Sequence, residues 1–152
     1  MARPRDSGAV TIALAIIRIG VGVHIVLFGF DRIAWVLDAT PIATQLSTWL
    51  ATAGPIARWY LERLIPGVPL YARLVPLASM AAGVALAFGV WTRISAAVSL
   101  VTIVSLQFGS GTMFTFAYFA DAEGPPLIGA LVGLIIAGQV HRPQRPIPPP
   151  RS

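Results

Sequence analysis

Residues 10–30 read VTIALAIIRIGVGVHIVLFGF, and this stretch sets the class of fold. Arg18 is its only Asp, Glu, Lys or Arg residue. About 20 consecutive apolar residues in a helix cross the hydrocarbon core of a bilayer. The stretch is longer than the apolar part of a signal peptide, and no small-x-small cleavage site follows it. We therefore expect residues 10–30 to form a retained membrane span.

The composition of the whole chain agrees with a membrane protein. Hydrophobic residues make up 56% of its 152 residues and charged residues 11%, with a mean hydropathy of +0.77. A small soluble domain keeps much of its surface exposed and could not hide so many apolar side chains. Three further apolar stretches occur at residues 70–91, 94–116 and 126–140, the last near the lower limit for spanning. The expected fold is an all-α four-transmembrane-helix bundle, a single membrane domain over residues 1–152.

The long connection at residues 33–69 predicts one or two short amphipathic helices outside the membrane. Apolar residues recur there at helical spacing on both sides of the helix-breaking pair Gly54-Pro55. Trp49 and Trp59 are expected to pack at the membrane interface, where aromatic residues gather. The tail at residues 143–152 is rich in Pro and Arg, which predicts a flexible arm.

The distribution of Arg predicts the orientation. The segments joined to the two termini and to the 91–94 turn hold six Arg residues, and the other connections hold four. The positive-inside rule then places both termini in the cytoplasm of a bacterium, with the protein in its inner membrane. The net charge of +5 does not point to nucleic acid, because the Arg residues are scattered and form no basic stripe. The absence of Cys excludes thiolate metal sites and iron–sulfur clusters formed by this chain alone.

Arg18 is the most informative single residue. It lies about 12 Å along the helix from Val10 at 1.5 Å per residue. A charge at that depth is costly and usually functional or paired, yet no span holds an Asp or Glu to pair with it. Two interpretations stay open. Arg18 either extends toward lipid headgroups at the membrane surface, or faces a cavity and binds an anionic or carbonyl-bearing ligand such as a quinone headgroup.

His24 and Gln107 are the other candidate ligand-binding residues. His24 lies roughly 120° around the helix from Arg18, so the two side chains do not share a face. A polar pocket formed by His24 and Gln107 could hydrogen-bond a quinone carbonyl, and the alternative is that Gln107 bonds across helices. Haem ligation by His24 would need a second ligand. We expect no metal site, no catalytic residue and no intrinsic cofactor, because no nucleophile elbow, zinc motif or pair of intramembrane carboxylates occurs.

Glycines in the second and fourth stretches favour close approach of helices. Gly83 and Gly89 lie in the second, and Gly129 and Gly133 form a GxxxG pair in the fourth. Packing inside the bundle and dimerisation are the two uses that this pattern allows.

Two segments resemble the DoxX family of small four-helix membrane proteins. The first is RIGVGVH at residues 18–24, continuing to Phe28-Gly29 and the basic Arg32. The second is GVALAFGVWTR at residues 83–93, similar to the glycine-rich second span of the family with its Gly-x-x-Thr-Arg end. Residues 78–82, ASMAA, lack the Glu that members often carry there. The resemblance implies a four-helix fold and association with membrane oxidoreductases, since members include a thiosulfate:quinone oxidoreductase subunit.

Three hypotheses of function follow. The first is a DoxX-like accessory subunit of a membrane-bound oxidoreductase or electron-transfer complex, in contact with quinone or lipid and with the helices of partner subunits. The second is a purely structural or assembly subunit of a larger respiratory or photosynthetic complex, with no ligand chemistry. The third is a standalone enzyme or small transporter, which the missing intramembrane acids and cysteines disfavour.

Overall fold

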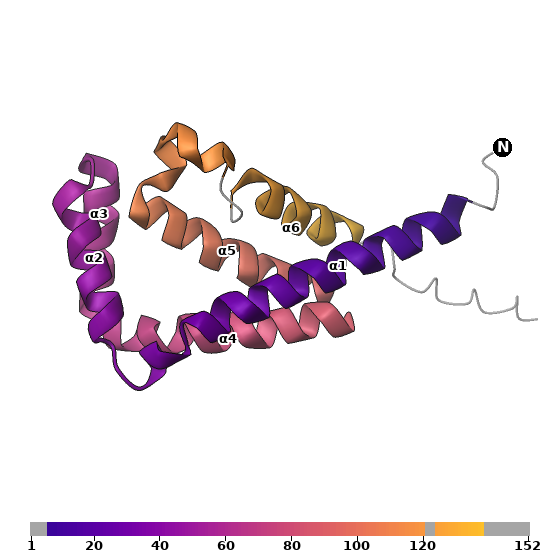
Figure 1. Cartoon of the computed structure of the whole chain (residues 1–152), viewed down its shortest axis with the longest axis horizontal. Coiled ribbons are helices and arrows are strands. Elements are labelled where there is room, and N and C mark those ends of the chain that lie inside the picture. Colours follow the sequence, from indigo (N-terminus) through magenta and orange to yellow (C-terminus); the bar gives the residue numbers. More distant parts are fainter. Residues whose placement is uncertain (1–5, 121–123, 139–152) are drawn as a thin grey trace, which may run out of the picture.

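The computed structural model of the protein describes residues 6–120 and 124–138. The α-helices of this part are α1 (Asp6–Asp31), α2 (Thr40–Thr52), α3 (Pro55–Leu64), α4 (Val68–Phe88), α5 (Thr92–Ser110) and α6 (Pro125–Ala137). Short 3-10 helices join them: η1 (Ile33–Val36), η2 (Ile65–Gly67), η3 (Thr112–Phe114) and η4 (Phe116–Ala120). The described residues contain no strand, so this part of the fold is all-α as expected. Figure 1 shows α2 and α3 lying across one end of a bundle formed by the other helices.

In the part of the chain that the structure describes, three helical stretches are long and apolar enough to cross a membrane. They comprise residues 8–31, residues 55–88, where α3, η2 and α4 follow without a break, and residues 92–110. Helix α6 is also apolar but has only 13 residues. The structure therefore supports a membrane-embedded protein with three candidate spans by length and composition, and a shorter apolar helix where a fourth span is expected.

The second span ends earlier than expected because a glycine closes its helix. Helix α4 stops at Phe88, and Gly89 follows with a left-handed φ of 76°. The N–H of Val90 then donates to the carbonyl of Ala85 at 2.9 Å. This is the Schellman arrangement, which satisfies the last carbonyls of a helix and turns the chain away from its axis.

The third and fourth apolar stretches also differ from the expected bounds. Helix α5 ends at Ser110 instead of residue 116, because Gly111 is left-handed with a φ of 74° and short 3-10 turns follow it. Helix α6 begins at Pro125 and ends at Ala137. Residues 139–140 of the expected fourth span lie outside the described residues, as does the tail at 143–152.

Helices α2 and α3 form a cap with a small core of its own. Trp49 packs beside this core, half buried, whereas Trp59 is 58% exposed and has the Arg63 guanidinium 4.8 Å from its ring centre. Trp59 lies on the exposed face of α3, because Ala57 and Leu61 form the buried face of this helix. Its expected place at the membrane interface stays a prediction. The buried residues of the cap core are Ile42, Leu46, Leu61, Val68 and Ala72.

The beginning of α2 is held by a carboxylate. The N–H of Thr40 donates to the Asp38 carboxylate at 2.8 Å. Hydrogen bonds from the side chain and then the backbone of Thr40 hold the pKa of Asp38 below its usual value. Thr40 is the first residue of the helix, and its N–H is the donor of this hydrogen bond.

Helices α1 and α4 pack with their backbones in contact. A Cβ atom added at Gly22 would lie 2.8 Å from the Gly83 carbonyl oxygen and 2.8 Å from the Ala87 nitrogen. One added at Gly29 would lie 2.8 Å from the Pro76 carbonyl oxygen. Because the later residue of α1 meets the earlier residue of α4, the two helices are antiparallel. Glycines at such positions are what allow two helices to approach this closely in a membrane.

The bundle core is formed by side chains of α1 and α4 together with side chains of α5 and α6. Ile25 of α1, Leu86 of α4, Ile103 of α5 and Leu131 of α6 are at most 1% exposed and belong to one cluster. This shared cluster is what holds the short α6 against the three longer helices.

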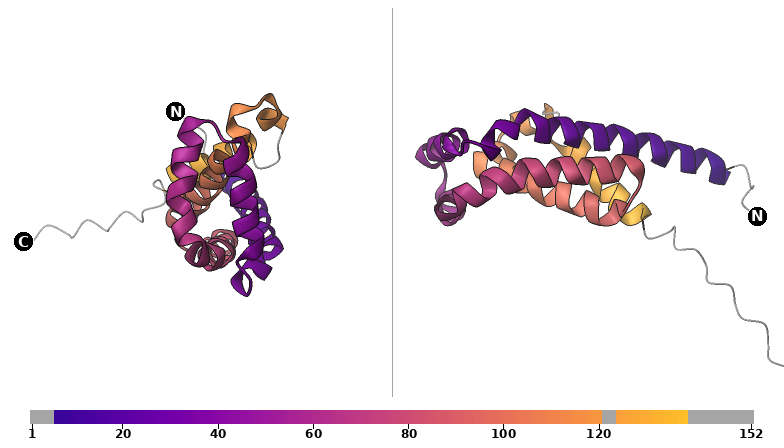
Figure 2. Two further views of the ribbon diagram at one scale, coloured as in Figure 1. Left: turned by 90° about the vertical axis from the view of Figure 1, so that its left-hand side faces the viewer. Right: turned by 90° about the horizontal axis from the view of Figure 1, so that it is seen from below.

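The first part of α1 extends beyond α4 (Figure 2). Ala87 packs against Gly22, and α4 ends one residue later, so the residues of α1 before Gly22 have no α4 beside them. Only 11% of the most apolar part of α1 is buried. Its exposed apolar side chains in this part are Val10, Ile12, Ile16, Ile17 and Ile19. They form an exposed apolar surface that suits contact with lipid or with another helix.

We predict that Gly22→Ala destabilises the protein by about 1–3 kcal/mol, the usual cost of forcing a methyl group into a closely packed contact. Gly20→Ala is the matched control, because no atom lies within 4 Å of a Cβ added there. Denaturant unfolding of both variants in detergent micelles, followed by circular dichroism, measures the difference. Equal stabilities would show that the α1–α4 contact is not as close as described.

Candidate functional site

Arg18 lies in the middle of α1, at the level where α4 has ended. Its side chain is partly buried, and its Nε is enclosed without a hydrogen-bond partner. No described carboxylate forms an ion pair with it; among the side chains that the structure describes, Arg32 and Asp31 form the only salt bridge. The guanidinium lies directly against Gly89, at a position where an added Cβ would collide with it. Gly89 therefore both ends α4 and makes room for Arg18.

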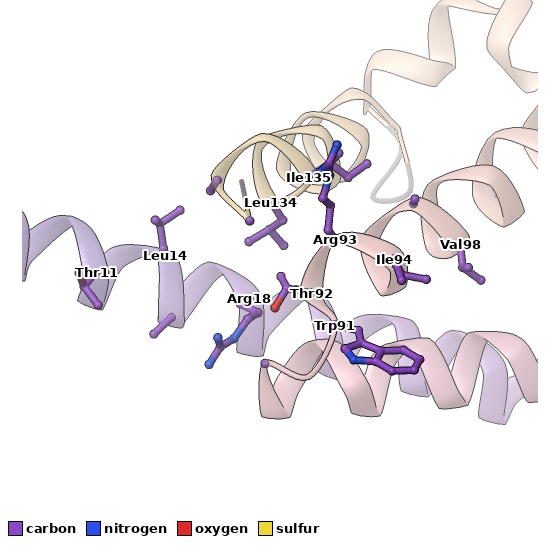
Figure 3. Close-up of a pocket in the computed structure, with 15 residues that line it drawn as sticks. Thr11, Leu14, Arg18, Trp91, Thr92, Arg93, Ile94, Val98, Leu134 and Ile135 are labelled. Atoms are coloured by element: carbon purple, nitrogen blue, oxygen red, sulfur yellow. The ribbon is translucent and has the colours of Figure 1, made fainter. Parts of the chain in front are cut away.

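Arg18 lines a cavity of about 950 Å³ between the first part of α1, the α4–α5 turn and the end of α6 (Figure 3). Its wall is mostly apolar, with few polar side chains. The lining residues are Thr11, Leu14, Ala15, Arg18, Gly89, Trp91, Thr92, Arg93, Ile94, Ala97, Val98, Leu134, Ile135, Ala137 and Gly138. An apolar wall with a few convergent polar groups is the usual form of a small-molecule site.

Arg93 is a second charged residue of this cavity and was not among the site residues expected from the sequence. It stands in the first turn of α5, and its Cβ lies close to Gly138 at the end of α6. Figure 3 shows the two Arg side chains leaving their helices in different directions, Arg18 toward the end of α4 and Arg93 toward α6. No Asp or Glu is among the described lining residues, so the cavity carries two uncompensated positive charges.

The two segments singled out in the sequence, residues 18–24 and 83–93, meet at this cavity. Arg18 belongs to the first, and Gly89, Thr92 and Arg93 belong to the second. The sequence feature that could have pointed to Arg93 is the Gly-x-x-Thr-Arg turn at residues 89–93. This turn puts a second cation at the same end of the bundle as Arg18.

The structure does not bring Arg18, His24 and Gln107 together. His24 lines neither described cavity, and its Nε2 is buried without a hydrogen-bond partner. Gln107, 4% exposed, lines a second cavity at the capped end of the bundle. The reason is axial position, since His24 is about 9 Å along α1 from Arg18 and α5 carries Gln107 further toward the cap.

The second cavity has a volume of about 120 Å³. Trp35, Trp49 and Gln107 line it together with Arg32. Arg32 donates to the carbonyl of Phe28 at 3.0 Å, and its guanidinium lies 3.7 Å from the centre of the Phe28 ring. A space of this size holds about four water molecules at ~30 Å³ each. It is too small for an amphiphile, and Arg32 already has partners.

Gly129 and Gly133 do not pack inside the bundle. Both are exposed, and no described atom lies within 4 Å of a Cβ added at either position. Of the two uses that the sequence allows for this GxxxG pair, packing inside the bundle is not seen among the described residues, because Leu127, Leu131 and Leu134 form the buried face of α6. Gly83 contacts α1, and Gly89 contacts a side chain instead of a helix backbone.

The described residues contain no group of three or more His, Cys, Asp or Glu side chains that could hold a metal ion. The chemistry that the large cavity itself offers is hydrogen-bond donation and positive charge. Arginine stays protonated in proteins, so it can bind and orient a ligand but does not relay a proton.

We predict that Gly89→Ala displaces the Arg18 guanidinium and exposes it to solvent reagents. Gly111→Ala is the control, because Gly111 has the same left-handed φ but no atom within 4 Å of an added Cβ. Both variants lose roughly 1–2 kcal/mol from forcing Ala into that conformation. Phenylglyoxal modification of Arg18, measured by peptide mass spectrometry, is expected to be faster only in Gly89→Ala. Equal rates in the two variants would contradict the contact.

Comparison with known proteins finds no matching family model, no matching curated protein and no matching solved structure. The resemblance to the DoxX family stays a prediction, carried by residues 18–32 and 83–93.

Proposed function

We propose that this protein crosses the membrane four times, through α1, α4, α5 and α6. Support comes from α6, which is apolar and shares the bundle core although its 13 residues rise only about 20 Å. Short apolar helices are accommodated by local thinning of the bilayer. Asp31, Arg32 and Arg73 then mark the outer boundary, with the α2–α3 cap beyond them. Both termini lie in the cytoplasm and the membrane is the bacterial inner membrane.

Single cysteines test this topology, because the natural chain has none. In intact cells a membrane-impermeant maleimide is expected to label Ser47→Cys in the cap, and to leave Ser7→Cys and Ser152→Cys unlabelled until the cells are permeabilised. An odd number of crossings would place Ser7 and Ser152 on opposite sides. Labelling of only one of those two in intact cells would therefore overturn the four-span proposal.

The function that the geometry supports best is the binding of an amphiphile by a non-catalytic membrane subunit. The observation that carries it is Arg18, a charged span residue without a described partner that lines a largely apolar cavity. Such a cavity fits a molecule with an apolar body and a head that accepts hydrogen bonds. A quinone, with its carbonyl head, and a lipid, with its phosphate head, are both molecules of this kind. The resemblance to DoxX proteins suggests the setting, an accessory subunit of a membrane-bound oxidoreductase or electron-transfer complex.

The side chains around the cavity support a binding role more than a catalytic one. The described lining residues offer no thiol, carboxylate or imidazole. A general acid or base needs a group that gains and loses a proton near neutral pH, and Arg does not. In such a complex this chain would hold and orient the amphiphile, and a partner subunit would supply the redox chemistry.

A structural or assembly subunit is the second candidate, favoured by the exposed apolar face of α1. The side chains of residues 10–19 extend past α4 with little cover from the rest of the bundle. A helix of a partner subunit could lie on that face without any ligand in the cavity. The two candidates differ in what the loss of Arg18 should do.

Purification from native membranes separates the two candidates. We expect the natural protein to retain an extractable quinone or lipid, and Arg18→Gln to retain about tenfold less, the loss that follows removal of a charge-assisted hydrogen bond. Arg58→Gln, which removes an exposed charge from α3 in the cap, is expected to match the natural protein. Partner subunits should remain with all three. A natural protein without bound amphiphile, or with equal amounts on Arg18→Gln, would leave the structural role as the better explanation.

A further inference from the structure

We propose that the Arg18 cavity binds the phosphate headgroup of an anionic phospholipid from the inner leaflet, with Arg18 and Arg93 as its cationic residues. This inference rests on the amphiphile-binding function proposed above and names the class of ligand. Four observations support it: the charge of the cavity, the free amides beside it, the apolar wall and its depth.

The charge of the cavity favours an anion over a neutral carbonyl. Arg18 and Arg93 contribute two positive charges, and the described lining residues contain no acid to offset them. A quinone carbonyl accepts hydrogen bonds but leaves both charges uncompensated. A phosphate carries its own negative charge and forms stronger, charge-assisted hydrogen bonds with Arg. Basic pockets between transmembrane helices on the cytoplasmic side are known sites for anionic lipid headgroups.

The first turn of α5 adds donors to the same place. Helix α5 begins at Thr92, and Trp91 before it has a left-handed φ of 47° and provides no side-chain cap. The amide groups at the beginning of a helix have no acceptor within it and carry partial positive charge. Trp91, Thr92 and Arg93 all line the cavity, so this end of α5 adds to the positive potential that the two guanidinium groups create.

The wall of the cavity suits the acyl chains of a lipid better than a free anion. Leu14 of α1, Val98 of α5 and Leu134 of α6 line it from three helices. Figure 3 shows the two guanidinium groups directed to different sides, so they do not enclose one small ion between them. A headgroup with its glycerol and acyl chains is large enough to meet both sides of a cavity of about 950 Å³.

The depth of the cavity explains why a headgroup would enter it. A hydrocarbon core about 30 Å thick, measured along α1 from Asp31, reaches to about Thr11 at 1.5 Å per residue. Arg18 then lies about 10 Å inside the inner boundary, at the level where α4 has already ended. Charged side chains at such depth are accommodated by thinning of the bilayer and by polar groups drawn toward them. Because α4 ends before it reaches the inner boundary, space remains beside α1 through which a lipid headgroup can reach Arg18.

Native mass spectrometry of the full chain tests the inference. The protein is released from mixed micelles that contain phosphatidylcholine with phosphatidylglycerol, with a ubiquinone or with inorganic phosphate. We expect selective retention of phosphatidylglycerol. Arg18→Gln should reduce it about tenfold, as expected for one charge-assisted hydrogen bond. Arg93→Gln should reduce it by a smaller factor, through the loss of positive potential in the cavity. Arg58→Gln, in the cap, should retain as much as the natural protein. Arg93 is exposed at a helix end, so its variant tests the site without disturbing the α1–α4 contact.

The outcomes separate this inference from the proposed function. Equal retention of phosphatidylglycerol and phosphatidylcholine, or Arg18→Gln and Arg93→Gln values that match Arg58→Gln, would overturn the choice of an anionic lipid. Retention of ubiquinone that depends on Arg18, without phosphatidylglycerol, would overturn it and leave amphiphile binding intact. Retention of inorganic phosphate alone would show an anion site and no lipid. A protein that retains no amphiphile would contradict both proposals.

Discussion

The close contact between the backbones of α1 and α4 at Gly22 and Gly83 organises the bundle. Neither position has space for a Cβ atom, so the two helices meet in one register. That register places the end of α4 opposite the middle of α1. Because α1 is the longer helix, its first part continues beyond its neighbour. The overhang and the cavity beside it are consequences of this one contact and of the difference in helix length.

The environment of Arg18 follows from the same register. If α4 continued for one more turn past Phe88, its backbone would occupy the space that the Arg18 guanidinium takes. At the level of Arg18, α4 has ended and Gly89 has turned the chain away, which leaves a surface without side chain. The charge therefore faces a cavity instead of a packed helix. A costly residue in a membrane span is tolerated here because the fold gives it room and a route to polar partners.

Particular residues show how far reasoning from the sequence reached. The span at residues 10–30, the cationic character of its middle and the helix break at Gly54-Pro55 could be read from apolar runs and breakers, which are local signals. The exposure of Gly129 and Gly133 could not be predicted, because helical spacing shows which residues share a face of their own helix and not which face another helix covers. His24 and Gln107 were grouped by chemistry, and the packing of the helices separated them.

The amino-acid order therefore specified what each segment is: apolar length, breakers, and a single charged residue at Arg18 of the first span. These properties depend on transfer of side chains and backbone from water to an apolar medium, which each segment carries alone. The packing of the bundle determined which residues face each other. It places the end of α4 at the level of Arg18, brings Arg93 of α5 to the same cavity, and leaves the glycines of α6 on its outer face. Those relations arise from close contacts between segments distant in the chain, and no local pattern contains them.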